Sequence, residues 1–340
     1  MTRSDRPAVA WLDRFFDVHH RRRPVDATFI GVHAHDHRLP DFTEEGAGDT
    51  LADLQDLLAS APAVDLGRWT DGDVDALDVR LAAGFLRIAS WEMGSAHFHR
   101  GNPSLYTGEA VFGVLSLFLT EHGPLRERVE AARARMEEVP AFLGQARANV
   151  RSAPAAWLER AVRECDGALA LFTDGLRALA AERSIEDVPF ARAAERAARA
   201  FARHRAHLEA QRTGARRGGV ACGEEALALH LREGHFLEAD ADEIARYAEE
   251  ALAAAASEQE RGASGIGGGS PEEALATLSG LHPDADGYYG RYGEIWEEMR
   301  ALAEEKGLVT WPDFPIRYVP RPEWTRTAAP HLYFLHYRSP

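Results

Sequence analysis

The feature that most constrains the fold is a long apolar stripe between residues 154 and 182. Its members follow one another at steps of three and four: Leu158, Val162, Cys165, Leu169, Phe172, Leu176 and Leu179. Residues with this spacing share one face of an α-helix, so the stripe predicts one long helix with a buried side. Similar stripes predict helices over 73–94, 125–150, 187–210 and 241–257, and together they indicate a large helical bundle.

A further helix is expected at the centre of this bundle. The run "VFGVLSLFLTEH" at 111–122 is apolar on nearly every side, as buried helices are, and it is too short to cross a membrane. Helix starts are predicted at Asp240, which has Glu243 three residues later, and at Ser270, which precedes Pro271.

Two stretches depart from the helical pattern. The glycine-rich "GASGIGGGS" at 262–270 is predicted to be a flexible loop between helices. The residues from 311 to 340 are rich in proline and aromatic side chains, and "HLYFLHY" favours a β conformation. We therefore predict a mainly α protein with a single helical domain over 1–340. Residues 1–310 form the bundle, and an extended, β-prone tail at 311–340 packs on a partner or on a missing C-terminal half.

The composition argues against several classes of function. The net charge of -15 over 340 residues would repel phosphate, so we expect no nucleic-acid and no membrane partner. Only Cys165 and Cys222 are present, which indicates neither a disulfide framework nor a cysteine zinc site. Lys306 is the single lysine, which argues against Schiff-base or phosphate-loop chemistry. With no secretory leader or apolar span in view, we expect a cytoplasmic protein.

A histidine-rich segment, "FIGVHAHDHRLPDF", raises the question of a metal site. On an extended segment His33, His35 and His37 would project to one face beside Asp36, and such a set could hold zinc. The repeated strand and helix units of an amidohydrolase barrel are absent, and the spacing is one residue short of a metallo-β-lactamase motif. We therefore predict a surface turn with no metal ligands, and keep an independent histidine-cluster metalloenzyme as the weakest alternative.

Other catalytic motifs are missing from the sequence. "HLREGH" places His230, Glu233 and His235 near a helix end, but their spacing does not put two ligands one turn apart. The sequence contains no His-Glu dipeptide and no Gly-x-Ser-x-Gly elbow. A His-Glu-x-x-His zinc helix is therefore excluded within these residues, so whether the chain is itself an enzyme stays open.

One polar loop offers candidate site residues. "HFHRGNPSLYTGE" at 97–109 joins two apolar helices and carries His97, His99, Asn102 and Tyr106. One interpretation is a plain helix connection stopped by proline; the other is a loop that lines a substrate cleft. We take these four residues as the substrate-cleft candidates and assign no catalytic residue.

Several segments, in order, resemble a known family. They are "FIGVHAHDHRLPDF", "GNPSLY", "VPAFLGQARANV", "ACGEEALALHLRE" and "FPIRYVPRPEW". Together they are similar to the N-terminal part of the bacterial family called domain of unknown function 885. The resemblance implies a helical, zincin-like metallopeptidase architecture, in which a His-Glu-x-x-Pro-Gly-His helix and a later glutamate bind zinc.

Those zinc-binding elements belong to the family's second half, and none of them can be placed on this sequence. The resemblance therefore implies a non-catalytic helical half that forms one wall of a substrate cleft. The expected partner is a second polypeptide that carries the zinc-binding half, with zinc the cofactor of that half and no cofactor in this chain. A peptide or small-molecule substrate fits this hypothesis. The alternative is a stand-alone, degenerate family member that acts as a helical binding or scaffold protein.

Overall fold

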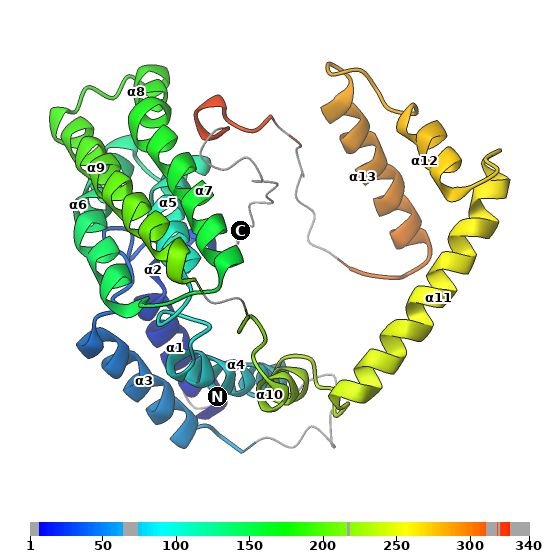
Figure 1. Cartoon of the computed structure of the whole chain (residues 1–340), viewed down its shortest axis with the longest axis horizontal. Helices are drawn as coiled ribbons and strands as arrows, with labels where there is room; N and C mark the ends of the chain where they lie inside the picture. The colour runs from blue at the N-terminus through cyan, green and yellow to red at the C-terminus, as the bar shows by residue number, and fades with distance from the viewer. Residues whose placement is uncertain (1–6, 64–73, 216–217, 311–317, 319, 327–340) are drawn as a thin grey trace. The chain divides into compact units, whose positions relative to one another are not determined.

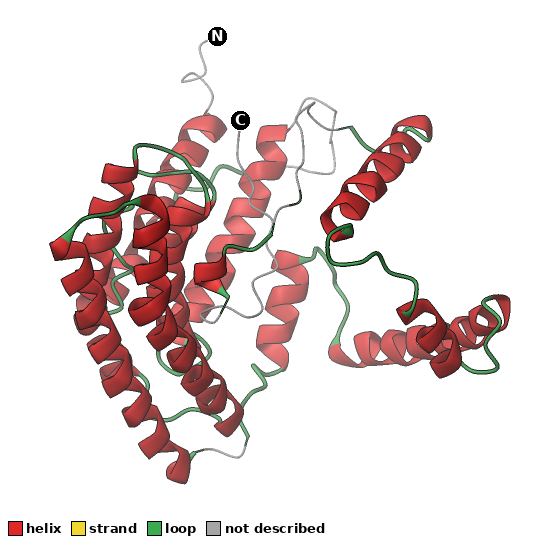
Figure 2. Cartoon of the chain, turned by 90° about the horizontal axis from the view of Figure 1, so that it is seen from above, coloured by secondary structure: helices red, strands yellow, loops and turns green. Residues whose placement is uncertain are grey.

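Apolar residues at helical spacing form helices in almost every described segment. The computed structural model describes residues 7–63, 74–215, 218–310, 318 and 320–326, and in these ranges the regular structure is helical, without a strand (Figures 1 and 2). The longer helices are α1 (Pro7–Arg22), α2 (Pro24–Phe29), α3 (Glu44–Ala59), α4 (Val74–Gly94), α5 (Pro103–Leu119), α6 (Leu125–Asn149), α7 (Ala155–Ala170), α8 (Leu176–Arg183), α9 (Val188–Gln211), α10 (Glu224–Gly234), α11 (Ala241–Gly265), α12 (Pro271–Ser279) and α13 (Tyr288–Glu305). Short turns of other helix types are η3 (Leu171–Gly175), η4 (Arg212–Gly214) and η5 (Glu323–Thr325).

The sequence signals for helix starts are confirmed as caps. Asp240 accepts a hydrogen bond from the backbone of Glu243, whose side chain accepts one from the backbone of Asp240, so both orphan amides are satisfied. Ser270 accepts from the N–H of Glu273, with proline at the first helical position. The long helix predicted over 154–182 is confirmed as the continuous run α7, η3 and α8.

The chain divides into two compact units. Unit 1 comprises Met1–Glu238 and Pro322–Pro340, and unit 2 comprises Ala239–Arg321. The single domain expected over 1–340 is not tested by this division and stays a prediction.

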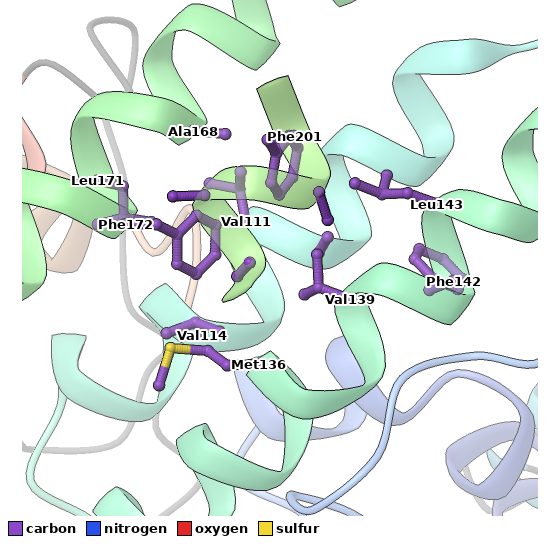
Figure 3. Close-up of a cluster of buried hydrophobic side chains, with 14 of the residues drawn as sticks. Val111, Val114, Met136, Val139, Phe142, Leu143, Ala168, Leu171, Phe172 and Phe201 are labelled. Atoms are coloured by element: carbon purple, nitrogen blue, oxygen red, sulfur yellow. The ribbon is translucent and has the colours of Figure 1, made fainter. Parts of the chain in front are cut away.

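The main core of unit 1 is formed by α5, α6, α7 and α9. Figure 3 shows side chains from these helices meeting in one cluster, including Val114, Met136, Leu143 and Phe201. The α5 segment is buried along almost its whole length, which confirms a central helix in the run expected at 111–122, although the helix ends at Leu119. Its apolar residues are therefore removed from water, which at about 25 cal/mol per Å² is the main stabilising term of this core.

A second cluster in unit 1 joins α1, α3 and α4. Trp11, Phe15, Leu57 and Leu86 pack together there, and the indole N–H of Trp11 donates a hydrogen bond to the carbonyl of Leu57 over 3.0 Å. Because that donor is satisfied, the ring can be buried without losing a hydrogen bond to water. The two clusters thus give unit 1 two apolar centres.

Unit 2 has very little core of its own. Among its described residues only Ala263 and Ala274 are buried. Along α13 the apolar residues Tyr288, Tyr292, Ile295, Met299 and Leu302 recur at steps of four and three and all lie exposed. This spacing is the seam of a helix that packs against another helix.

Two predictions concern the C-terminal side of the sequence, namely the glycine-rich loop and the tail. The helix predicted over 241–257 continues to Gly265, so the first residues of the expected flexible loop at 262–270 are helical. The prediction was wrong there because the alanine-rich turns preceding the glycines propagate the helix at small cost per added residue. Most of the tail at 311–340 lies outside the described residues. In the part that is described, Glu323–Thr325 form the turn η5, and Trp324 is buried against Phe118 in the main core of unit 1.

Candidate functional site

A cavity in unit 1 lies between helices α1 to α5. Its volume is about 250 Å³. Phe15, Phe42, Phe85 and Phe98 supply aromatic walls, and Leu54, Leu57 and Met93 are among its aliphatic lining residues. A concave, mostly apolar space with a few polar groups is the usual form of a small-molecule site.

On the lining of this cavity, Glu109 has a strongly shifted pKa. It is the one charged residue of α5, and its Oε2 is buried with no hydrogen-bond partner in the described part of the chain. Burial, and next the negative charge of Asp26, raise the pKa of Glu109 to about 8, although Arg23 and Arg135 lower it. The carboxyl group is therefore mainly neutral at pH 7 and ionises easily if a cation approaches.

The basic side chains on the same lining already have acidic partners. Arg22 contacts Asp53 over 2.7 Å, and Arg23 contacts Glu92 over 3.2 Å. The guanidinium of Arg23 also lies over the rings of Phe85 and Phe98, with its central carbon 5.1 and 5.8 Å from their centroids.

His19 adds no positive charge to the cavity at neutral pH. Burial, together with the positive charges of Arg23 and His20, lowers its pKa to about 4. Asp26 and Glu109 are the two acids on the lining.

The four residues predicted to line a cleft have structural partners instead. Asn102 caps α5 by accepting a hydrogen bond from the N–H of Ser104. The hydroxyl of buried Tyr106 donates to the carbonyl of His99 over 2.8 Å. The ring of His99 stacks on Phe42, and His97 lies against Trp91 and Trp157.

The cavity is lined by the sequence neighbours of these candidates, Phe98 and Leu105. The candidate loop therefore positions a wall of the cavity, and ligand contact by the four residues themselves stays a prediction.

The histidine-rich segment forms the turn expected at 33–37, but one of its histidines meets a residue far along the chain. Asp36 Oδ2 accepts a hydrogen bond from His33 Nδ1 over 2.9 Å and lies 3.5 Å from His122 Nε2. Asp36 Oδ1 accepts from the hydroxyl of Thr28 over 2.6 Å. His33, Asp36 and His122 thus form a cluster that the sequence analysis did not foresee, because His122 is remote in sequence.

The geometry of this cluster favours hydrogen bonding over metal binding. The rings of His33 and His122 are stacked, with centroids 3.7 Å apart and planes 5° from parallel. An imidazole nitrogen binds a metal through a lone pair in its ring plane, about 2.0–2.1 Å away for zinc. Two parallel stacked rings share no such point, so one ring would have to turn before both could bind one ion.

Arg135 holds the histidine-rich segment in place, and sequence analysis missed it. Its side chain is fully buried and donates to the backbone carbonyls of Pro24, His35, Arg38 and Gly113. It also donates to the hydroxyl of Thr28. Its burial could have been inferred from the sequence, because Arg135 falls on the apolar face of α6 beside Met136 and Ala132.

The "HLREGH" segment has a structural role in this fold. Glu233 is buried and contacts Arg80 over 2.8 Å and Arg87 over 3.0 Å, both on α4. Burial opposes ionisation, but hydrogen bonds from Arg232 and Arg80 and the charge of Arg87 outweigh it and lower the pKa of Glu233. The ion pairs attach α10 to α4.

Comparison with known proteins gives a family and a related structure. The family described as "Bacterial protein of unknown function (DUF885)" matches residues 24–339. A structure described as that of "a putative lipoprotein of unknown function from Shewanella oneidensis" aligns with a TM-score of 0.66 at 22% identity, which shows a shared fold. The alignment covers 89% of this chain and 58% of the Shewanella chain, so this chain spans less than two thirds of that protein.

Neither a further comparison nor the helices themselves give a name for the activity. No curated protein matches the sequence. Among the described helices, none combines the length and apolar character that a membrane span requires. The family match covers nearly the whole sequence, and the chain therefore belongs to the bacterial family of unknown function DUF885.

Proposed function

We propose that this chain is the helical, non-catalytic part of a metallopeptidase-like hydrolase and that it pairs with a separate polypeptide carrying the zinc-binding part. Its role is to form one wall of the substrate cleft. The observation that carries the proposal is the exposed seam of α13 in unit 2, formed by Tyr288, Tyr292, Ile295, Met299 and Leu302.

The length of the related protein supports this choice of partner. The Shewanella structure extends well beyond the region it shares with this chain, since only 58% of it is covered. A polypeptide equivalent to the uncovered part would supply the missing surface. The sequence contains no His-Glu dipeptide, so in the proposed complex a zinc helix of the His-Glu-x-x-His type would come from that partner.

The seam is chemically suited to another polypeptide. Its five residues recur as the a and d positions of a heptad do, and three of them are aromatic or carry the flexible methionine thioether that is common at interfaces. Exposed apolar faces of this kind mark interaction sites in soluble proteins.

The test is a binding measurement between this chain and a separately expressed polypeptide that contains the zinc-binding part of a DUF885 protein. Met299→Glu places a charge in the seam. Ala301→Glu places the same charge two residues further along α13, at an exposed position outside the seam. We expect complex formation, a loss of affinity of about tenfold or more for Met299→Glu, equal to about 1.4 kcal/mol, and little change for Ala301→Glu.

Peptide hydrolysis provides the functional readout. The mixture should cleave an unstructured peptide in the presence of Zn²⁺, and each polypeptide alone should not. The proposal would be wrong if the two polypeptides did not associate, or if both substitutions changed the affinity equally.

A second candidate function is a stand-alone helical binding protein. The observation that favours it is the cavity of about 250 Å³, whose lining residues all belong to unit 1. A ligand could bind there without any second polypeptide. Ligand binding by a chain that does not associate with the zinc-binding part would select this function.

A further inference from the structure

The lining of the unit 1 cavity indicates what size and charge a ligand would have. Its aromatic walls come from α1, α4 and the segments that precede α3 and α5. The volume of about 250 Å³ is below the range of pockets that hold drug-sized molecules. The ligand is therefore small, with room for one ring or a branched aliphatic group.

The polar groups of the lining favour a cation. Asp53 and Glu92 neutralise Arg22 and Arg23, while Glu109 Oε2 has no donor among the described residues. A buried acceptor without a partner is unfavourable, and a ligand that supplies a donor recovers the lost free energy. An ammonium group supplies both the donor and the opposite charge.

The other charged groups near Glu109 do not supply that donor. Arg135 faces it from α6, but its donors go to backbone carbonyls and to Thr28. Arg23 approaches from the start of α2, where it also contacts Asp26 over 3.8 Å. Asp26 also lines the cavity and lies close enough to raise the pKa of Glu109, so its negative charge favours a cation there even though it is shared with Arg23.

We propose that this cavity binds a small primary amine, with an aromatic or branched aliphatic group against the phenylalanine walls and its ammonium group hydrogen-bonded to Glu109. This inference rests on the second candidate function, namely ligand binding within unit 1. It does not depend on pairing with a zinc-binding polypeptide, which is tested separately by complex formation.

The step involves only proton transfer and hydrogen bonding. At pH 7 the amine is an ammonium ion and the Glu109 carboxyl is mainly protonated. Binding forms an ammonium–carboxylate pair, so the carboxyl proton leaves to solvent. About one proton per bound amine is therefore released.

The experiment compares 2-phenylethylamine with 2-phenylethanol, which has a nearly identical shape and no charge, by calorimetric titration of the full chain at pH 7. We expect the amine to bind at least tenfold more tightly. Repeating the titration in buffers of different ionisation enthalpy measures the proton released with the amine.

Two variants with the same change of charge separate the cavity from the surface. Glu109→Gln keeps the shape of the lining and should remove both the tenfold preference and the proton release. Glu137→Gln changes an exposed residue of α6 that contacts Arg196 over 3.2 Å, and it should change neither. Circular dichroism of both variants verifies that they are folded.

The outcomes are distinct. Equal binding of the two probes, or an unchanged preference in Glu109→Gln, would overturn the amine assignment and leave the cavity as a site for neutral ligands. Binding of neither probe would overturn the ligand site together with the second candidate function. Neither result bears on whether the chain pairs through α13.

Discussion

The imidazole rings of His33 and His122 lie face to face, 3.7 Å between centroids, and both present a nitrogen to the same oxygen of Asp36. Burial and the neighbouring His33 lower the pKa of His122, although Asp36 raises it. A pKa lowered from 6.5 leaves His122 mainly neutral at pH 7.

The ring geometry leads to a prediction about zinc. Because the lone pairs of the two stacked rings do not converge, we expect Zn²⁺ to bind this cluster far more weakly than structural zinc sites, whose binding free energies are about 10–16 kcal/mol. Titration with a competing chelator measures this. Tight binding that is lost in both His122→Ala and Asp36→Asn would show that one ring turns and that the prediction is wrong.

His204 should make unit 1 less stable in acid. It is buried in α9, and burial, with the charges of Arg147 and His207, lowers its pKa from 6.5 to about 4. The unfolded chain binds a proton more readily than the folded chain between these values, so stability is complete above pH 6.5 and falls as the pH drops towards 4. At 1.36 kcal/mol per pH unit, the loss is about 3 kcal/mol.

Replacing this histidine tests the assignment. Urea unfolding of His204→Leu between pH 7 and 4.5 should show a smaller loss of stability than the unmodified chain, whereas His235→Gln, at the exposed end of α10, should follow the unmodified chain. His19, with a pKa also near 4, accounts for part of the remaining slope. An unchanged slope in His204→Leu would contradict the assignment.

Glu109 should have the opposite effect at higher pH. Its pKa is raised from 4.5 to about 8 in the folded chain, so between these values the carboxyl ionises in the unfolded chain but stays protonated in the folded chain. Its contribution to stability is therefore lost as the pH rises through that interval. Glu109→Gln has no carboxyl group to ionise, so it should stabilise unit 1 by about 4 kcal/mol more at pH 8.5 than at pH 5, at 1.36 kcal/mol per pH unit of the shift. Thermal unfolding at pH 5 and 8.5 gives the comparison; equal effects at both values would show that ionisation is not the cause.

Arg135 should be essential for the ordered histidine-rich segment. Lysine cannot reproduce its hydrogen bonds to four carbonyls, and a buried charge with lost partners costs about 3–5 kcal/mol. We expect Arg135→Lys to lower the free energy of unfolding by about that amount. The exposed Arg126→Lys, which keeps its surface pair with Glu130, serves as the matched control and should leave the free energy of unfolding almost unchanged.

Hydrogen exchange can locate the effect of Arg135→Lys. The amide of Val32, which donates to the carbonyl of Ala27 next to the histidine-rich segment, should lose more protection in Arg135→Lys than the amides of α9 do. Uniform loss of protection along unit 1 would indicate a general core defect instead.

Two glycines inside helices should respond in opposite ways to alanine. A Cβ at Gly84 would lie 2.5 Å from the carbonyl oxygen of Glu233, so Gly84→Ala must separate α4 from α10 and should destabilise unit 1 by about 1–3 kcal/mol. A Cβ at Gly108 meets nothing within 4 Å, and Gly108→Ala should stabilise α5 by up to about 1 kcal/mol. Unfolding midpoints of the two variants give both signs, and a stabilising Gly84→Ala would show that the helices can repack.

The sequence by itself determined the helices, because their evidence is local. Spacings of three and four, the caps at Asp240 and Ser270 and the apolar run of α5 depend on residues within a few turns of each other. The end of α11 was misplaced for a related reason, since glycine lowers helix propensity without deciding where a helix stops.

Only the tertiary structure decided which polar residues meet. His122 joins Asp36, Arg135 reaches the carbonyls of the histidine-rich segment, and Glu109 lines a cavity formed with Phe15 and Phe85. Each of these contacts joins residues that are distant in the chain, and no local spacing encodes them. Burial then changes the chemistry of these groups, because the cost of a charge depends on the surrounding helices and not on its sequence neighbours.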